Sequence, residues 1–265
     1  MKIAVIGCGR WGSFIAWYLD KIGNEVTLYG RETSEKMKNF LENRKNNFLE
    51  LPKSISLTTN INDVFDKDLI IISVGTQGLR DLLNENRVLF KETNIPIILC
   101  MKGIEIKTGF TPTKIVKDIL GENYSCGAWI GPGHVQDFTN GIPNCMVIDS
   151  DDRELVKKLV DSFSSNLIRF YYGTNLLGNE IGAASKNVIG IAAGMLDGFN
   201  LSSLKGALMS RGTREIARLI EKMGGDKSCA HGLCHLGDYE ATVFSKFSNN
   251  RKFGEKFVKG KSFEK

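Results

Sequence analysis

The sequence has little proline, few cysteines for its length and no long apolar run. With 5 prolines in 265 residues, a proline-rich linker is excluded. The 6 cysteines are too few for a disulfide scaffold in a chain of this size, and reduced thiols are expected. No apolar stretch approaches the roughly 18–20 residues that span a bilayer. We find no signal peptide either, because the first apolar stretch runs directly into a glycine turn, and we expect a cytoplasmic protein.

The hydrophobic content is 42%, which excludes a disordered chain and provides for a large core. The formal net charge is +5, but it is unevenly placed. Residues 246–265 contain seven lysines or arginines and two glutamates, whereas residues 1–245 hold 28 charges of each sign. A local basic segment fits a rim that attracts phosphate groups or a solvated terminus, and we predict no nucleic-acid partner.

Short apolar segments alternate with helix-like patterns over the first two thirds of the chain. The predicted strands are 2–6, 25–29, 69–74, 95–101, 126–130, 144–148 and 167–172. One predicted helix follows residues 7–12 and runs to about Ile22, and the others are 33–47, 77–84, 112–120 and 152–163. This alternation predicts an α/β fold with a largely parallel, doubly wound, Rossmann-like sheet.

The pattern changes after about Gly173. Residues 179–222 show no convincing strand and contain two helix-like segments separated by a short linker. We therefore predict a dinucleotide-binding domain over 1–175 and an all-helical substrate domain over 176–265.

Three glycines, Gly7, Gly9 and Gly12, form a G-x-G-x-x-G pattern between the first predicted strand and the first helix. The first glycine allows the tight turn, the second allows the backbone to approach a pyrophosphate, and the third allows close packing of helix on strand. The helix N-terminus adds amide donors for the phosphate. The pattern predicts a dinucleotide cofactor, against the alternative of a purely structural turn.

Arg31 lies two residues after the second predicted strand, where NAD-preferring proteins usually have an acidic residue. A guanidinium suits the 2′-phosphate of NADPH better than a ribose diol, so the sequence favours NADPH over NADH as the cofactor. Glu32 follows directly, and an exposed surface arginine is the alternative interpretation.

A second informative segment, residues 179–199, has small residues at i+3 and i+4 spacing, so these share one helix face. Lys186 lies on that face and is the only cation of the segment. The spacing leaves two roles open, a buried ion-pair partner or an acid/base whose pKa is lowered by burial.

Six motifs together resemble bacterial-type NAD(P)-dependent glycerol-3-phosphate dehydrogenase in order and spacing. They are GCGRWG (7–12), KGIE (102–105), GAASKNVIGIAAGMLDGF (182–199), LMSRGTREIARL (208–219), LGD (236–238) and NNRKFG (249–254). The resemblance covers essentially the whole chain, and the segment around Lys186 is its most specific part.

The resemblance implies interconversion of dihydroxyacetone phosphate and sn-glycerol 3-phosphate for phospholipid synthesis, with Lys186 as the catalytic acid/base. The substrate contacts that it implies are Lys102, Gly131, Gly133, Asp238, Ser248, Asn249 and Asn250. The cofactor contacts that it implies are Gly7, Gly9, Arg10, Trp11, Gly12, Arg31, Lys102, Val135 and Asn249. Analogy with similar dehydrogenases also suggests a homodimer.

The sequence departs from the family in three places. Residues 131–135 read GPGHV, which lacks a hydroxyl donor that the family has. Asn249 replaces an arginine, and Arg251 is nearby but is not aligned with it. The chain ends at Lys265, where the family normally continues, so we expect a C-terminally short member. These departures leave open a related dehydrogenase of another phosphorylated or acidic hydroxy substrate, or a catalytically weak nucleotide-binding protein.

Four residues that can bind metals, Cys229, His231, Cys234 and His235, lie within seven positions. Structural zinc sites usually join two ligand pairs across a longer loop, so we predict no metal and expect free thiols and loop histidines.

Overall fold

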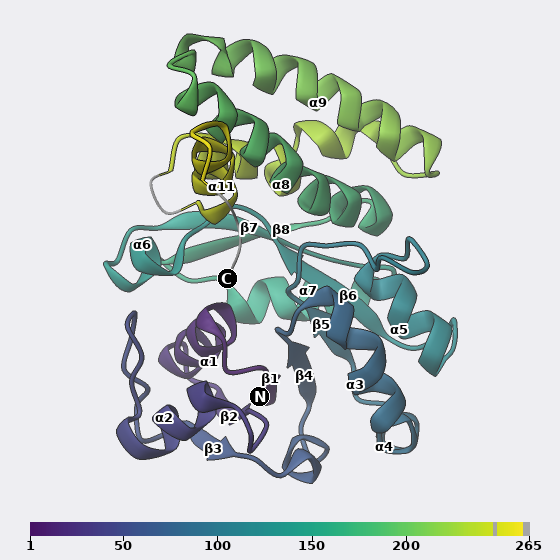
Figure 1. The fold of residues 1–265 in the computed structure, drawn as a ribbon. Helices are drawn as coiled ribbons and strands as arrows, with labels where there is room; N and C mark the ends of the chain where they lie inside the picture. The colour runs from purple at the N-terminus through teal and green to yellow at the C-terminus, as the bar shows by residue number, and fades with distance from the viewer. Residues whose placement is uncertain (246–247, 262–265) are drawn as a thin grey trace.

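The computed structural model describes residues 1–245 and 248–261. A twisted sheet with helices on both faces forms the larger part, and the helices of residues 176–258 pack beyond strands β7 and β8 (Figure 1). No helix within the described residues is both long and apolar enough to cross a bilayer.

The sheet has eight strands in the order β3-β2-β1-β4-β5-β6-β7-β8. They are β1 (Lys2–Ile6), β2 (Glu25–Tyr29), β3 (Ser56–Thr58), β4 (Leu69–Ile72), β5 (Ile97–Leu99), β6 (Cys126–Ile130), β7 (Asn144–Ser150) and β8 (Ile168–Tyr172). All neighbours are parallel except β6 and β7, which are antiparallel. The order reverses between β1 and β4, the position at which doubly wound sheets bind ligands.

Helices cover both faces of this sheet. They are α1 (Arg10–Lys21), α2 (Glu35–Asn43), α3 (Leu79–Glu85), α4 (Arg87–Thr93), α5 (Pro112–Leu120), α6 (Val135–Thr139) and α7 (Arg153–Phe163), with 3-10 turns η1 (Ile61–Val64) and η2 (Thr76–Gly78). Their starts follow local chemistry: Asp152 caps α7 by accepting a hydrogen bond from the Leu155 N–H at 3.0 Å, and Pro112 occupies the first turn of α5.

Successive side chains of a strand point to opposite faces of the sheet, and both faces are buried here, which explains why the strands are continuous apolar runs in the sequence. In β1, Ile3 and Val5 join the core that contains Phe14 of α1, whereas Ala4 and Ile6 join the core on the opposite face. Because helices cover both faces, the side chains of β1 from Ile3 to Ile6 are all apolar.

The remaining elements form the helical part of the molecule. They are α8 (Leu176–Gly198), η3 (Ser202–Leu204), α9 (Lys205–Lys222), η4 (Lys227–His231), the π-helical turn η5 (Leu233–Gly237), α10 (Asp238–Val243) and α11 (Asn249–Val258). The predicted small-residue face of α8 is buried, and α11 packs directly on it. A Cβ added to Gly194 would lie 1.9 Å from the backbone oxygen of Arg251, so the two helix backbones are in contact.

Two buried hydrogen-bonded contacts fix the start of α8 against the sheet part. The Asn179 amide donates to Asp149 Oδ2 at 2.7 Å. The Glu180 carboxylate accepts from both the N–H and the hydroxyl of Thr113, at the N-terminus of α5. Burial raises the pKa of Glu180 to about 7 in spite of these hydrogen bonds. Lys186, two turns further along α8, is thereby set in its position relative to the sheet.

The predicted α/β class, the largely parallel sheet and the helical C-terminal part are confirmed. Two strands are shorter than predicted, since β4 ends at Ile72 and β5 covers only three residues. The prediction missed β3, α4 and α6, which have three to seven residues each. The predicted domain division at 175 and 176 falls between β8 and α8, and the division into two domains stays a prediction.

Replacing Gly194 with alanine should push α11 away from α8. We expect Gly194→Ala to lower the free energy of unfolding by about 1–3 kcal/mol, the usual cost of overpacking, measured by urea unfolding. The matched control is Gly206→Ala on α9, where an added Cβ meets nothing within 4 Å and alanine should stabilise the helix by up to about 1 kcal/mol. Equal stability of the two variants would contradict close packing of α8 and α11.

Candidate active site

The turn between β1 and α1 has the backbone shape that a dinucleotide requires. Gly7 has a φ of +114°, and a Cβ on Gly12 would lie 1.8 Å from the Gly7 backbone oxygen, so α1 starts directly against the turn. Gly9, in contrast, has nothing within 4 Å of an added Cβ, and it precedes the first N–H groups of α1. Open space beside unpaired helix donors fits a pyrophosphate.

A cleft of about 630 Å³ extends from this turn across the carboxyl ends of β1, β2 and β4. Its lining includes Gly7, Gly9, Tyr29, Gly30, Arg31, Ser34, Lys36, Ser73, Val74 and Asn86. Arg31 is exposed at the end of β2, and Lys36 of α2 provides a second cation that sequence reasoning missed. The paired cations strengthen the prediction of a phosphate at this end of the cleft.

A second cleft of about 360 Å³ shares Gly9, Ser73 and Val74 with the first, so the two adjoin at the glycine turn. It is lined further by Arg10, Trp11, Cys100, Met101, Lys102, Gly133, His134 and Val135. The structure therefore brings six predicted contact residues to one cleft: Gly9, Arg10, Trp11, Lys102, Gly133 and Val135. A groove with phosphate donors at the glycine turn and a lysine in its lining suits a nicotinamide dinucleotide.

Beside the groove, one carboxylate binds two lysines, and one of these, Lys102, lines the groove. Asp238 Oδ2 accepts from Lys102 Nζ at 2.5 Å, and Asp238 Oδ1 accepts from Lys186 Nζ at 2.5 Å. The Asp238 side chain is only 2% exposed, and Lys102 at 21% is the most accessible of the three. Lys102 also donates to the Gly131 backbone oxygen at 2.6 Å. The three predicted residues come from distant segments, after β5, in α8 and at the start of α10.

Two lysines share one carboxylate, so positive charge is in excess in this cluster. Burial and, after it, the positive charge of Lys102 lower the pKa of Lys186 to about 8, because Asp238 offsets only part of their effect. At neutral pH Lys186 is thus mostly an ammonium that can give up its proton easily, which is the property required of an acid/base.

Sequence reasoning missed two polar residues of this cluster. Thr242, one helical turn after Asp238, accepts a hydrogen bond from Lys186 Nζ at 3.0 Å. Asn187 donates to the Lys102 backbone oxygen at 3.4 Å. Two features of the sequence could have indicated them: Asn187 directly follows Lys186, and Thr242 lies four residues after Asp238 on the same helix face.

The predicted contacts near residue 250 fall into three different environments. Asn250 donates to Asn187 Oδ1 at 2.8 Å and so joins the lysine cluster through Asn187. Ser248 is buried, and its hydroxyl caps α11 by accepting from the Arg251 N–H at 3.2 Å. Asn249 is exposed on the first turn of α11. The substrate and cofactor roles of these residues stay predictions.

The Cys/His segment packs inside the helical part. Cys229 and Cys234 are buried free thiols, and burial raises the pKa of Cys229 to about 11. The expectation of loop histidines is wrong for His235, which is fully buried in the π-helical turn, with Nδ1 2.7 Å from the Gly182 backbone oxygen. The small Gly182 leaves room for the imidazole ring, so packing explains this histidine.

Comparison with known proteins identifies the family. Two family models match: the N-terminal part of NAD-dependent glycerol-3-phosphate dehydrogenase over residues 2–156, and its C-terminal part over 175–265. A protein of Fusobacterium nucleatum named glycerol-3-phosphate dehydrogenase [NAD(P)+] is 35% identical over 100% of this chain and 80% of its own length. A protein of the same name from Neisseria meningitidis is 31% identical over 98% of this chain and 80% of its own.

The structures agree with the sequences. The crystal structure of glycerol-3-phosphate dehydrogenase from Coxiella burnetii superposes with a TM-score of 0.91 at 25% identity, covering 98% of this chain and 80% of that one. The residues that line the two clefts and the residues of the lysine cluster lie within the matched regions. The chain belongs to the NAD-dependent glycerol-3-phosphate dehydrogenase family.

Proposed function

We propose that this protein interconverts dihydroxyacetone phosphate and sn-glycerol 3-phosphate with NADH or NADPH. The general role of the family is to supply glycerol phosphate for phospholipid synthesis. The observation that carries the proposal is the Lys102–Asp238–Lys186 cluster, in which Lys102 also lines the dinucleotide groove. It combines a transferable proton with excess positive charge, as a phosphorylated ketone requires.

The chain's own residues provide the proton chemistry. A bound nicotinamide supplies or accepts the hydride. In reduction, the Lys186 ammonium gives its proton to the ketone oxygen; in oxidation, the neutral amine takes that proton back from the hydroxyl. Lys102, held by Asp238 and Gly131, orients the substrate and keeps the Lys186 proton labile. Asp238 holds both ammonium groups in place.

The remaining predicted contacts complete the proposed substrate and cofactor sites. Asn250 contacts the cluster through Asn187, and Gly131 accepts a hydrogen bond from Lys102. Asn249 and Ser248 are assigned by resemblance, with Ser248 also serving as the helix cap. The six free cysteines suit a reducing cytoplasm, and a homodimer stays a prediction.

One feature of the groove supports a second candidate, a related dehydrogenase of another phosphorylated or acidic hydroxy substrate. Gly133 has a φ of +144°, and a Cβ there would lie 2.4 Å from the Phe138 ring. A hydroxyl-bearing residue would therefore be strained at this position, and His134 lines the groove beside it.

Lys186→Ala should abolish most turnover without loss of cofactor binding. We expect kcat for dihydroxyacetone phosphate reduction to fall by about 10²–10⁴-fold, as for removal of a general acid, while NADPH affinity changes little. The measurement is nicotinamide absorbance with substrate, and fluorescence titration for binding. Lys227→Ala, at an exposed lysine of η4, serves as control. Turnover of other hydroxy or keto acids alone would favour the second candidate, and cofactor binding without any turnover would indicate a catalytically weak protein.

The pH dependence should follow the pKa of Lys186. Oxidation needs the neutral amine, so its kcat/KM should rise as pH increases through about 8; reduction needs the ammonium, so its kcat/KM should fall through the same value. Lys102→Met removes a neighbouring positive charge and should shift both midpoints to higher pH. Lys114→Met, at an exposed lysine of α5, should leave them near 8. Midpoints that do not move in Lys102→Met would contradict the coupling of the two lysines.

Cofactor preference should depend on Arg31. We expect Arg31→Ala to weaken NADPH binding by about tenfold, the effect of losing a charge-assisted phosphate contact of roughly 1.5 kcal/mol, and to leave NADH binding within a factor of two. Equilibrium titration with both cofactors measures the two affinities. An equal loss for NADH and NADPH would show that Arg31 does not contact a 2′-phosphate.

A further inference from the structure

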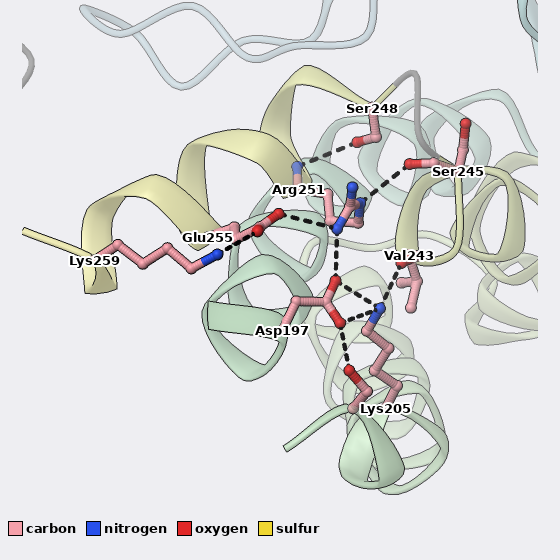
Figure 2. Close-up of polar contacts among 9 residues, drawn as sticks. Asp197, Lys205, Val243, Ser245, Ser248, Arg251, Glu255 and Lys259 are labelled. Atoms are coloured by element: carbon pink, nitrogen blue, oxygen red, sulfur yellow. Dashed lines mark hydrogen bonds and ion pairs between the residues drawn. The ribbon is translucent and has the colours of Figure 1, made fainter. Parts of the chain in front are cut away.

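A buried ion-pair cluster lies at the far end of α8, outside the lysine cluster (Figure 2). The carboxylate of Asp197 is paired with Lys205 Nζ at 2.6 Å and with Arg251 Nη1 at 2.7 Å, and it also accepts from the Ser202 hydroxyl at 2.7 Å. The side chains of Asp197, Lys205 and Arg251 are 14%, 9% and 15% exposed. Burial alone would raise the pKa of Asp197, but the hydrogen bonds from its three partners outweigh burial and lower it.

The two cations of the cluster also hold the chain segment that leads into α11. Lys205 Nζ donates to the Val243 backbone oxygen at 3.2 Å, and Arg251 Nε donates to the Ser245 backbone oxygen at 3.1 Å (Figure 2). The cluster therefore ties together the end of α8, the start of α9, the segment after α10 and the first turn of α11.

The two segments that Lys205 and Arg251 hold, around Val243 and around Arg251, lie next to residues that contact the lysine cluster. Asn250, which precedes Arg251, donates to Asn187 at 2.8 Å, and Asn187 in turn contacts the Lys102 backbone oxygen. Thr242, which precedes Val243, hydrogen-bonds Lys186 Nζ. A shift of α11 along α8 would break the Asn250 contact, because a hydrogen bond tolerates little change in the distance between donor and acceptor.

We propose that Arg251 is a positioning residue: its ion pair with Asp197 and its hydrogen bond to the Ser245 backbone hold Asn250 against Asn187, and thereby set the substrate side of the lysine cluster. This inference rests on the proposed function for its kinetic consequence, but its geometric part stands without it.

The same contacts determine what Arg251 does not do. Its Nη1 binds Asp197 and lies 3.4 Å from Glu255, and its Nε binds a backbone oxygen. This arginine, next in sequence to the Asn249–Asn250 pair, is turned toward the α8–α11 contact and not toward Lys102. It is thus a structural cation of the helical part, and it does not replace the arginine that the family has at position 249.

The test is a double-mutant cycle in the full chain. Arg251→Met keeps the apolar stem and leaves Asp197 paired with Lys205. We expect it to raise KM for dihydroxyacetone phosphate about tenfold while the Kd for NADPH changes less than twofold. Asn250→Ala should raise the same KM. If Arg251 acts through Asn250, the double variant should show the KM of the more affected single variant.

The control is Lys259→Met, which removes an exposed ion pair of the same helix with Glu255 and should leave KM unchanged. Arg251→Lys retains one cation for Asp197 but cannot reproduce both contacts, so its KM should lie between wild type and Arg251→Met; it also serves if Arg251→Met folds poorly. An unchanged KM in both Arg251 variants, or KM increases that multiply in the double variant, would overturn the proposal.

Hydrogen exchange separates this proposal from the proposed function. Amides of residues 250–254 should exchange faster in Arg251→Met than in wild type, and not in Lys259→Met. If the wild-type protein does not reduce dihydroxyacetone phosphate, the proposed function fails, and exchange still tests the anchoring of Asn250. Unchanged exchange in Arg251→Met would overturn the geometric part directly.

Discussion

The arrangement of the site depends on one carboxylate, Asp238, between two ammonium groups. Lys102 follows a strand of the sheet and Lys186 lies in the middle of α8, and without a negative charge between them they would repel each other in a poorly solvated place. Removing that carboxylate would leave two partly buried cations unpaired, which is far costlier than losing a surface ion pair. The π-helical turn and α10 position Asp238 at this junction, so the helical part and the sheet part meet around a shared charge.

A second carboxylate in the same helical part, Asp197, also binds two cations, yet its chemistry differs. Arg251 keeps its charge at any physiological pH, and Asp197 with its partners forms a fixed anchor. Lys186 can lose its proton, and burial together with Lys102 brings its pKa down to about 8. Each cluster has one residue on α8, Lys186 in the first and Asp197 in the second, and both clusters contact α11 or the segment before it. The Asp197 cluster is suited to hold the backbone, and the Asp238 cluster is suited to move a proton.

Much of this architecture could be predicted because it is local in sequence. Neighbouring residues are enough to predict the apolar strands between helices, the glycine turn Gly7-x-Gly9-x-x-Gly12 and the small-residue face of α8. The three-residue β3 was not predicted, because so short a strand shows no clear periodicity of apolar residues and its pairing with β2 depends on tertiary contacts. The partnership of Lys102, Lys186 and Asp238 spans up to 136 residues, so resemblance supplied these positions and only the fold brings them together. Likewise, the burial of His235 depends on the absence of a side chain at Gly182, 53 residues earlier.

The most direct test of the paired-lysine site is the titration of Lys186 itself. Its ε-methylene signal can be followed by NMR in protein labelled with ¹³C-lysine and assigned by comparison with Lys186→Arg. A titration midpoint near 8 is expected, because burial and the charge of Lys102 destabilise the ammonium more than Asp238 stabilises it. A midpoint at the ordinary lysine value of 10.5 would contradict the role of Lys186 as the acid/base of this site.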